Sequence, residues 1–180
     1  MIALALNCAS NGIKSGGLIC EFGVSKGRSM RMLTELLPKD RSMYGFDTFT
    51  GLPQAWGDEP AGSYSTNGVI PQFPPNVSLR IGLFEDTIEK FLKEKEVSKL
   101  PLAFANIDCD LYTSTTHVLA SMQSRIVPGT VLIFDEYICH PTWRNDEFRS
   151  FRESCKRFGW NYEYIAFSLT SKQAIVRILD

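Results

Sequence analysis

Short apolar runs alternate with segments of helical periodicity along most of the chain. Seven runs are predicted to be β-strands: residues 17–23, 41–46, 76–81, 102–107, 130–134, 162–167 and 173–178. The predicted helices cover residues 30–37, a segment started by Asp86 and Thr87, a segment capped by Ser114, and residues 144–158 before Gly159. The apolar opening, residues 1–9, is predicted to form one more packed helix.

This order of elements predicts an α/β fold. Repeated strand and helix units favour a Rossmann-like, doubly wound sheet of seven mostly parallel strands, with helices on both faces. Only residues 168–172 separate the last two strands, which is a hairpin-length connection, so this C-terminal pair is predicted to be antiparallel. Ligands are expected beyond the carboxyl ends of the strands.

The length of the chain predicts one domain over residues 1–180. Residues 52–76 contain five prolines and three glycines and show little periodicity, so they are predicted to form a long loop. Its aromatic residues Trp56, Tyr64 and Phe73 either cover an acceptor molecule as an active-site lid or pack the loop onto the body.

Composition narrows the classes of partner. The 19 basic and 20 acidic residues are interleaved, so no charged block predicts a nucleic-acid or membrane surface. The opening residues have no basic region and fit neither a secretory signal nor a membrane span. Five cysteines, an odd number without zinc-like spacing, favour reduced thiols in a cytoplasmic protein. A homo-oligomer stays open.

A glycine turn joins the first predicted strand to the first helix, in the segment Glu21 to Ser29 (EFGVSKGRS). The spacing is G-x-x-x-G with an acidic residue in front, which differs from the G-x-G-x-x-G of dinucleotide sites. Glu21 would repel a pyrophosphate and attract the ammonium group of a bound methionine moiety. In isolation, the turn also fits a purely packing role.

Carboxylates follow three of the predicted strands. Asp47 ends the second strand, where it suits either ribose hydroxyls or a turn. Asp108 and Asp110 follow the fourth strand, and Asp135 with Glu136 follows the fifth. Such clustering favours a hard divalent cation such as Mg²⁺, although the carboxylates can also divide into separate caps and ribose contacts.

Five collinear segments carry a family resemblance: 21–29 (EFGVSKGRS), 44–53 (YGFDTFTGLP), 82–87 (GLFEDT), 107–115 (IDCDLYTST) and 128–137 (PGTVLIFDEY). With them the chain resembles the class I S-adenosylmethionine-dependent methyltransferases of the macrocin O-methyltransferase group. It departs from that group at Glu136, where an Asp is usual, and in having few residues before the first strand.

The resemblance implies a cofactor site for S-adenosyl-L-methionine. Its turn residues hold the methionine end, Asp47 holds the ribose, and residues 82–84 lie along the adenine. The implied cofactor-binding residues are Glu21, Gly23, Ser25, Gly27, Ser29, Asp47, Gly82, Leu83, Phe84 and Asp108. The implied Mg²⁺ ligands are Asp108, Asp135 and Glu136.

The function implied is metal-assisted O-methylation of a small hydroxylated molecule, such as a sugar or a catechol-like phenol. Asp108, Asp110 and His140 are the candidate catalytic residues, although His140 also fits a solvated loop position. Two alternatives are an NAD(P)-dependent oxidoreductase and a non-catalytic S-adenosylmethionine-binding module. Glu21 argues against the first alternative, and the intact acidic cluster argues against the second.

Overall fold

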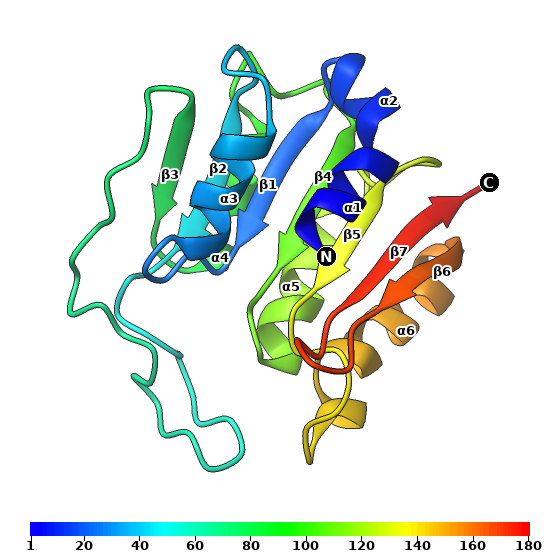
Figure 1. The fold of residues 1–180 in the computed structure, drawn as a ribbon. Helices are drawn as coiled ribbons and strands as arrows, with labels where there is room; N and C mark the ends of the chain where they lie inside the picture. Colours follow the sequence, from blue (N-terminus) through cyan, green and yellow to red (C-terminus); the bar gives the residue numbers. More distant parts are fainter.

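The computed structural model describes residues 1–180 as one twisted sheet of seven strands between helices (Figure 1). The strand order is β3-β2-β1-β4-β5-β7-β6. The strands are β1 (Leu18–Phe22), β2 (Met43–Asp47), β3 (Val77–Ile81), β4 (Leu102–Ile107), β5 (Val131–Phe134), β6 (Asn161–Phe167) and β7 (Ala174–Leu179). Strands β1 to β5 pair in parallel, whereas β7 is antiparallel to both β5 and β6. The predicted α/β sheet with a C-terminal antiparallel pair is confirmed.

Helices cover both faces of the sheet, as predicted. They are α1 (Ile2–Cys8), α2 (Ser10–Lys14), α3 (Arg28–Leu36), α4 (Phe84–Leu92), α5 (Tyr112–Met122) and α6 (Glu147–Phe158). The alternation of side chains along β1 explains this arrangement. Ile19 packs into a core with α1, α2 and α3, while Cys20 and Phe22 pack into a second core with α4, α5 and α6.

Two predicted helix starts are wrong by a few residues. Helix α4 begins at Phe84 instead of Asp86 and Thr87, because the acidic residues occupy its first turn and no side chain caps it. Helix α5 begins at Tyr112, before the predicted Ser114 cap, and it also has no side-chain cap. In both cases the backbone turns into the helix directly after a strand-end loop.

The helix predicted over residues 144–158 is two separate elements in the structure. They are a 3₁₀ turn, η1 (Trp143–Asn145), and then α6, with the backbone of Asp146 in a non-helical conformation (φ −104°, ψ −127°) between them. Gly159 ends α6 in the left-handed conformation, with φ of 72°, as its position predicts.

The segment between β2 and β3 contains no helix or strand and runs down one side of the molecule (Figure 1). It folds back on itself at its base, where the carbonyl oxygen of the buried Phe49 accepts hydrogen bonds from the backbone N–H groups of Thr66 (3.3 Å) and Gly68 (3.0 Å). Nearer the tip, Leu52 exchanges backbone hydrogen bonds with Gly62 and Ser63. The loop is therefore internally bonded and attached at a narrow base.

The chain contains neither a disulfide bond nor a helix that could span a membrane. All five cysteines are free thiols. None of the helices combines the length and the apolar character that crossing a bilayer requires.

Candidate functional site

Four polar or flexible residues follow strands that end at the same level. Phe46, Phe22, Ile107 and Phe134 lie in register across β2, β1, β4 and β5. The residues immediately after them, Asp47, Gly23, Asp108 and Asp135, therefore stand in a row along the carboxyl edge of the sheet.

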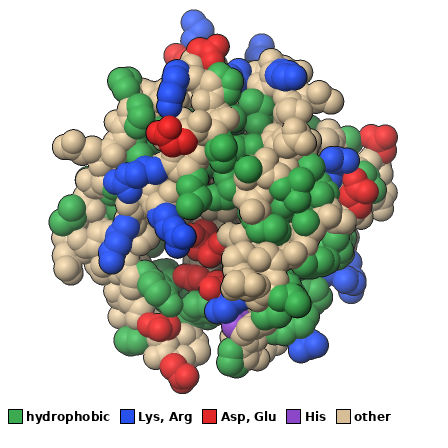
Figure 2. Space-filling model, viewed as in Figure 1, with side chains coloured by type: hydrophobic (Ala, Val, Ile, Leu, Met, Phe, Trp, Pro, Cys, Tyr) green, Lys and Arg blue, Asp and Glu red, His purple; other side chains and the backbone are tan.

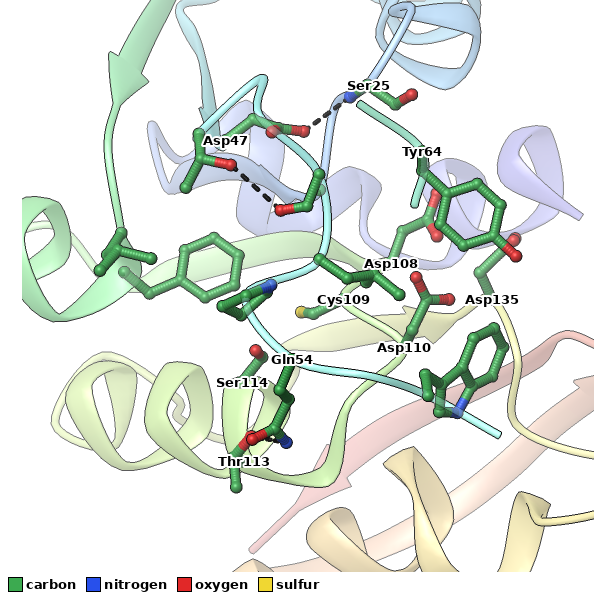
Figure 3. A pocket seen from close by; sticks show the side chains of 18 of the residues that line it. Ser25, Asp47, Gln54, Tyr64, Asp108, Cys109, Asp110, Thr113, Ser114 and Asp135 are labelled. Atoms are coloured by element: carbon green, nitrogen blue, oxygen red, sulfur yellow. Dashed lines mark hydrogen bonds between the residues drawn. The ribbon is translucent and has the colours of Figure 1, made fainter. Parts of the chain in front are cut away.

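This edge opens into a pocket with a volume of about 540 Å³. Acidic side chains gather in a hollow on the face shown in Figure 2, and the pocket walls appear from close by in Figure 3. Its lining comes from the strand ends, the first turns of α4 and α5, and the loop after β2. The lining residues are Gly23, Ser25, Asp47, Thr48, Gly51, Leu52, Pro53, Gln54, Trp56, Tyr64, Gly82, Leu83, Phe84, Glu85, Asp108, Cys109, Asp110, Thr113, Ser114, Asp135 and Glu136.

Gly23 lets the ends of β1 and β4 approach each other. Its φ is +92°, and a Cβ at this position would lie 1.8 Å from the carbonyl oxygen of Asp108. The N–H of Asp108 also donates to the carbonyl oxygen of Phe22 at 2.8 Å. No other residue type satisfies both the left-handed backbone and the missing side chain, so glycine is required here.

Asp47 connects the glycine turn to the end of β2. Its Oδ2 accepts hydrogen bonds from the backbone N–H groups of Val24 and Ser25, each at 2.7 Å, and its Oδ1 accepts one from Phe49 at 2.7 Å. Asp47 thus has the turn-forming role that the sequence left open. It also lines the pocket, and its oxygens keep lone pairs that these three bonds do not use.

Glu21 lies beneath the glycine turn and does not reach the pocket. Its side chain is fully buried, Oε1 accepts a hydrogen bond from Asn106 Nδ2 at 2.8 Å, and Oε2 has no partner. Burial raises the pKa of Glu21 to about 7, and hydrogen bonds from Ser29 and Asn106 partly offset that increase. At neutral pH, the carboxyl group of Glu21 is therefore present in both its protonated and its ionised form, directly behind the turn.

Two of the other predicted turn residues line the pocket, and two lie behind it. Gly23 and Ser25 line the pocket. Ser29 faces Glu21, and Gly27 packs against the ring of Phe73, where a Cβ would lie 2.4 Å from the ring. Phe73, predicted either as part of a lid or as packing, thus packs the loop onto the body.

Gly82, Leu83 and Phe84 form the wall on the side of β3. The N–H of Gly82 donates to the carbonyl oxygen of Asp47 at 3.0 Å, which connects this wall to the end of β2. The ring of Phe84 stands edge-on to Phe22, with 5.9 Å between the ring centroids. All three predicted residues line the pocket.

Asp108, Asp110, Asp135 and Glu136 form an acidic cluster on the opposite wall. Burial raises the pKa of Asp108 well above its usual value, and the charge of Asp135 raises it further. Burial also raises the pKa of Asp110 to about 7, with added repulsion from Glu136. A carboxylate with such a pKa can accept a proton at neutral pH.

The predicted Mg²⁺ ligands do not assemble into a metal-binding group. No three His, Cys, Asp or Glu side chains of the chain stand in an arrangement that could hold a metal ion. Asp135 accepts a hydrogen bond from Gln173 Nε2, and Glu136 pairs with Lys172 at 3.1 Å. Both partners, Gln173 and Lys172, lie in the connection between β6 and β7.

His140 does not line the pocket. Its Nε2 is hydrogen-bonded to the carbonyl oxygen of Glu136 at 2.8 Å, and its ring stands edge-on to Trp56 at 5.4 Å between centroids. Trp56 and Tyr64 do line the pocket, and Figure 3 shows Tyr64 on the side where Asp108, Asp110 and Asp135 gather. Of the three candidate catalytic residues, Asp108 and Asp110 face the pocket directly.

The sequence interpretation missed several polar residues around the site. Asn106, the hydrogen-bond partner of Glu21, is a buried amide in an otherwise apolar strand, and this exception to the pattern was the available signal. Gln54 Nε2 donates to Thr113 Oγ1 at 3.1 Å and connects the loop to α5. Nothing local to Gln54 or Thr113 in the sequence distinguishes them from other surface residues.

Comparison with known proteins identifies the family of this site. The profile of a family described as "Methyltransferase domain" matches residues 20–137, which include every residue of the acidic cluster. A curated relative from Streptomyces olivaceus is 31% identical over 140 residues, covering 67% of this chain and 53% of the relative. It is named 8-demethyl-8-(2,3-dimethoxy-alpha-L-rhamnosyl)-tetracenomycin-C 4'-O-methyltransferase. The chain therefore spans about half the length of this relative.

Solved structures agree with this family at the level of the fold. The O-methyltransferase NovP superimposes with a TM-score of 0.72 at 20% identity, covering 99% of this chain and 79% of NovP. The calicheamicin methyltransferase CalS11 gives a TM-score of 0.71 at 22% identity, covering 97% of this chain and 77% of CalS11.

The buried carboxyl group of Glu21 predicts a pH-dependent stability. Between its ordinary pKa of 4.5 and about 7, the unfolded chain releases the Glu21 proton while the folded chain retains it. The free energy of unfolding should therefore fall as the pH rises through this range, by about 3 kcal/mol from this group. Glu21→Gln should flatten the slope, measured by denaturant unfolding at pH 4.5 to 8.

Asp58→Asn is the matched control, because Asp58 is an exposed acid on the loop. It should leave the slope unchanged. An equal slope in wild type and Glu21→Gln would contradict the assigned burial of an ionisable Glu21.

Proposed function

The chain belongs to the methyltransferase-domain family, and from this premise we propose that it transfers the methyl group of S-adenosyl-L-methionine to a hydroxyl group of a small, sugar-like molecule. The observation that carries the proposal is the strand-end pocket, where seven of the ten predicted cofactor residues line the same cavity as the acidic cluster. Its volume of about 540 Å³ lies in the range of small-ligand sites.

The charge of the pocket supports a sulfonium cofactor. Six carboxylate side chains line it, from Asp47, Glu85, Asp108, Asp110, Asp135 and Glu136, and no Lys or Arg does. Such a wall attracts the positive sulfonium and ammonium groups of S-adenosylmethionine and repels the phosphates of NAD(P). The donor set therefore fits the proposed cofactor and disfavours the oxidoreductase alternative.

Three parts of the pocket suit three parts of that cofactor. Gly23 and Ser25 would hold the methionine end, with Glu21 behind them. The free lone pairs of Asp47 would accept hydrogen bonds from the ribose hydroxyls, and the wall at residues 82–84 would lie along the adenine. Gly27 and Ser29 would act indirectly, by supporting the turn and Glu21.

The acidic cluster and the loop aromatics suit a sugar-like acceptor. Carboxylates accept hydrogen bonds from hydroxyl groups, and the aromatic faces of Trp56 and Tyr64 offer apolar surface to the C–H groups of a ring. The name of the Streptomyces olivaceus relative refers to methylation of a rhamnosyl-bearing compound. Sugar hydroxyls are accordingly the first acceptor class to test, and catechol-like phenols are the second. Membership in the macrocin O-methyltransferase group stays a prediction.

Asp110 is our candidate for the general base. The reaction is an in-line displacement: the acceptor oxygen forms a bond to the methyl carbon, the methyl–sulfur bond breaks to release S-adenosylhomocysteine, and the base takes the proton of the acceptor hydroxyl. Asp110 lines the pocket and has a pKa of about 7, whereas His140 is bonded to the backbone outside it. Asp108, at the adjoining strand end, would orient the acceptor and the methyl group.

A magnesium ion at Asp108, Asp135 and Glu136 stays a prediction of the sequence. The oxygen ligands suit a hard cation chemically, but their present contacts with Gln173 and Lys172 do not fit a bound ion. The proposed chemistry is therefore built on the side chains of the protein alone.

Calorimetric titration separates the proposed cofactor from its alternative. We expect saturable binding of S-adenosylhomocysteine, with a dissociation constant of roughly micromolar order for a ligand of this size. NAD should not bind, because its phosphates would meet an acidic lining that contains no Lys or Arg. Binding of NAD alone would refute the proposed function. Methyl transfer from labelled S-adenosylmethionine to a panel of deoxysugar glycosides and catechols then tests turnover against the non-catalytic alternative.

Asp110→Asn tests the general base. We expect kcat to fall by about 10²-fold or more, because the amide cannot accept the proton, while the affinity for S-adenosylhomocysteine changes by less than about threefold. In the wild type, kcat should rise with pH through about 7 as Asp110 loses its proton, and the variant should lose this dependence. Asp40→Asn, a change at an exposed acid between α3 and β2, should retain the wild-type rate and profile. A wild-type rate in Asp110→Asn would remove Asp110 from the mechanism.

Lys172→Met tests the predicted metal. Any ion bound through Glu136 has to displace Lys172, so removing this positive charge should raise the affinity for Mg²⁺ about tenfold in a titration with magnesium chloride. Lys93→Met is the control, since Lys93 forms an exposed ion pair on α4 with Glu89. If magnesium binds neither the wild type nor Lys172→Met, the predicted magnesium site is wrong.

A further inference from the structure

Glu147 is a fully buried acid that neither the sequence interpretation nor the proposed chemistry uses. It is the first residue of α6, its side chain is 0% exposed, and Oε1 accepts a hydrogen bond from the backbone N–H of Cys109 at 3.2 Å. Oε2 is buried without a partner. An acidic side chain at a helix N-terminus interacts favourably with the helix dipole even when it is exposed to water. The dipole of α6 therefore does not explain why Glu147 is buried.

The N–H of Cys109 lies where β4 leaves the sheet. One residue earlier, the N–H of Asp108 still donates to Phe22 of β1, and the carbonyl oxygen of Ile107 still accepts from Asp135 after β5. At Cys109 neither neighbouring strand continues, and the backbone donor is buried. Glu147, 38 residues further along the chain, supplies its acceptor.

The turn that follows needs such an anchor. Asp110 has φ of +59°, a left-handed conformation that is unfavourable for a residue with a side chain. The N–H of Leu111 closes the turn on the carbonyl oxygen of Cys109 at 2.6 Å, and the buried side chain of Leu111 leads into α5. The directions of Asp108 and Asp110 depend on how this short turn is held.

We propose that Glu147 is a positioning residue: through its hydrogen bond to Cys109, it fixes the turn that aims Asp108 and Asp110 into the pocket. It does not touch the pocket itself, and it acts from behind the wall. The kinetic part of this inference rests on the methyl transfer proposed above, whereas the structural part does not.

Three variants test the proposal. Glu147→Gln keeps the length and an acceptor oxygen, whereas Glu147→Met keeps the length and lacks a strong acceptor. Ser150→Ala is the matched control, because Ser150 is buried one turn further along α6 and its hydroxyl bonds Thr116 on α5 instead of the strand-end turn.

The first measurement is hydrogen exchange of the Cys109 amide, which needs neither cofactor nor acceptor. We expect this amide to be protected in the wild type, in Glu147→Gln and in Ser150→Ala, and to lose about tenfold or more of its protection in Glu147→Met. If the wild-type amide exchanges as fast as that of the exposed loop residue Asp58, the contact is absent and the proposal is overturned, whether or not the variants fold.

The second measurement separates positioning from general stability. With the acceptor that turns over in the panel above, Glu147→Met should lower kcat about tenfold or more while KM for S-adenosylmethionine changes by less than about threefold. Glu147→Gln should stay within about twofold of the wild type, and so should Ser150→Ala.

These outcomes distinguish the two proposals. Equal kinetics in Glu147→Met and Ser150→Ala would overturn the positioning role, and so would a folded Glu147→Gln that is as slow as Glu147→Met. If no acceptor turns over and S-adenosylhomocysteine does not bind, the proposed function fails, while the exchange measurement still decides whether Glu147 holds the turn.

Discussion

The close approach of the β1 and β4 ends is the constraint on which the rest of the site depends. Without a side chain at Gly23, the backbone of Asp108 can lie directly against the glycine turn. Asp47 then bonds the same turn from the β2 side with a single carboxylate. Three strand ends are thereby held together, β1 to β4 by backbone packing and β1 to β2 by the carboxylate of Asp47. The contact between Gly23 and Asp108 also determines where the side chains of Asp108 and Asp110 lie.

The acidic groups around this edge are held at an electrostatic cost. Burial and mutual repulsion raise the pKa values of Glu21, Asp108, Asp110 and Asp135, so each resists ionisation in the free protein. A region of this kind destabilises the fold when it is charged, and a positively charged ligand relieves the repulsion. Under the proposed function, binding of the cationic cofactor would relieve the same repulsion that destabilises the ionised cluster.

The sequence predicted the sheet and its polar edge correctly, because parallel strands that are buried on both faces are continuously apolar. The run 102–107 coincides with β4, and its following Asp108 lies at the pocket as expected. The first residues of the helices were predicted less accurately, since α4 and α5 begin without the side-chain caps on which the predictions were based. Behind the pocket, the sequence pointed to Glu21, Gly27 and Ser29 but not to Glu147. The bond between Glu147 and Cys109 spans 38 residues, and no local pattern distinguishes a buried helix acid from an exposed one.

The loop after β2 differs from the rest of the pocket in how it is attached. Its base is closed by the carbonyl oxygen of Phe49, and its tip is bonded mainly to itself, with side-chain contacts such as Gln54 to Thr113 reaching the body. Changes in the length or composition of residues 52–63 would leave the sheet and the glycine turn undisturbed. Under the proposed function, acceptor preference could therefore diverge in evolution, or be engineered by transplanting this segment, without changing the part of the pocket predicted to hold the cofactor.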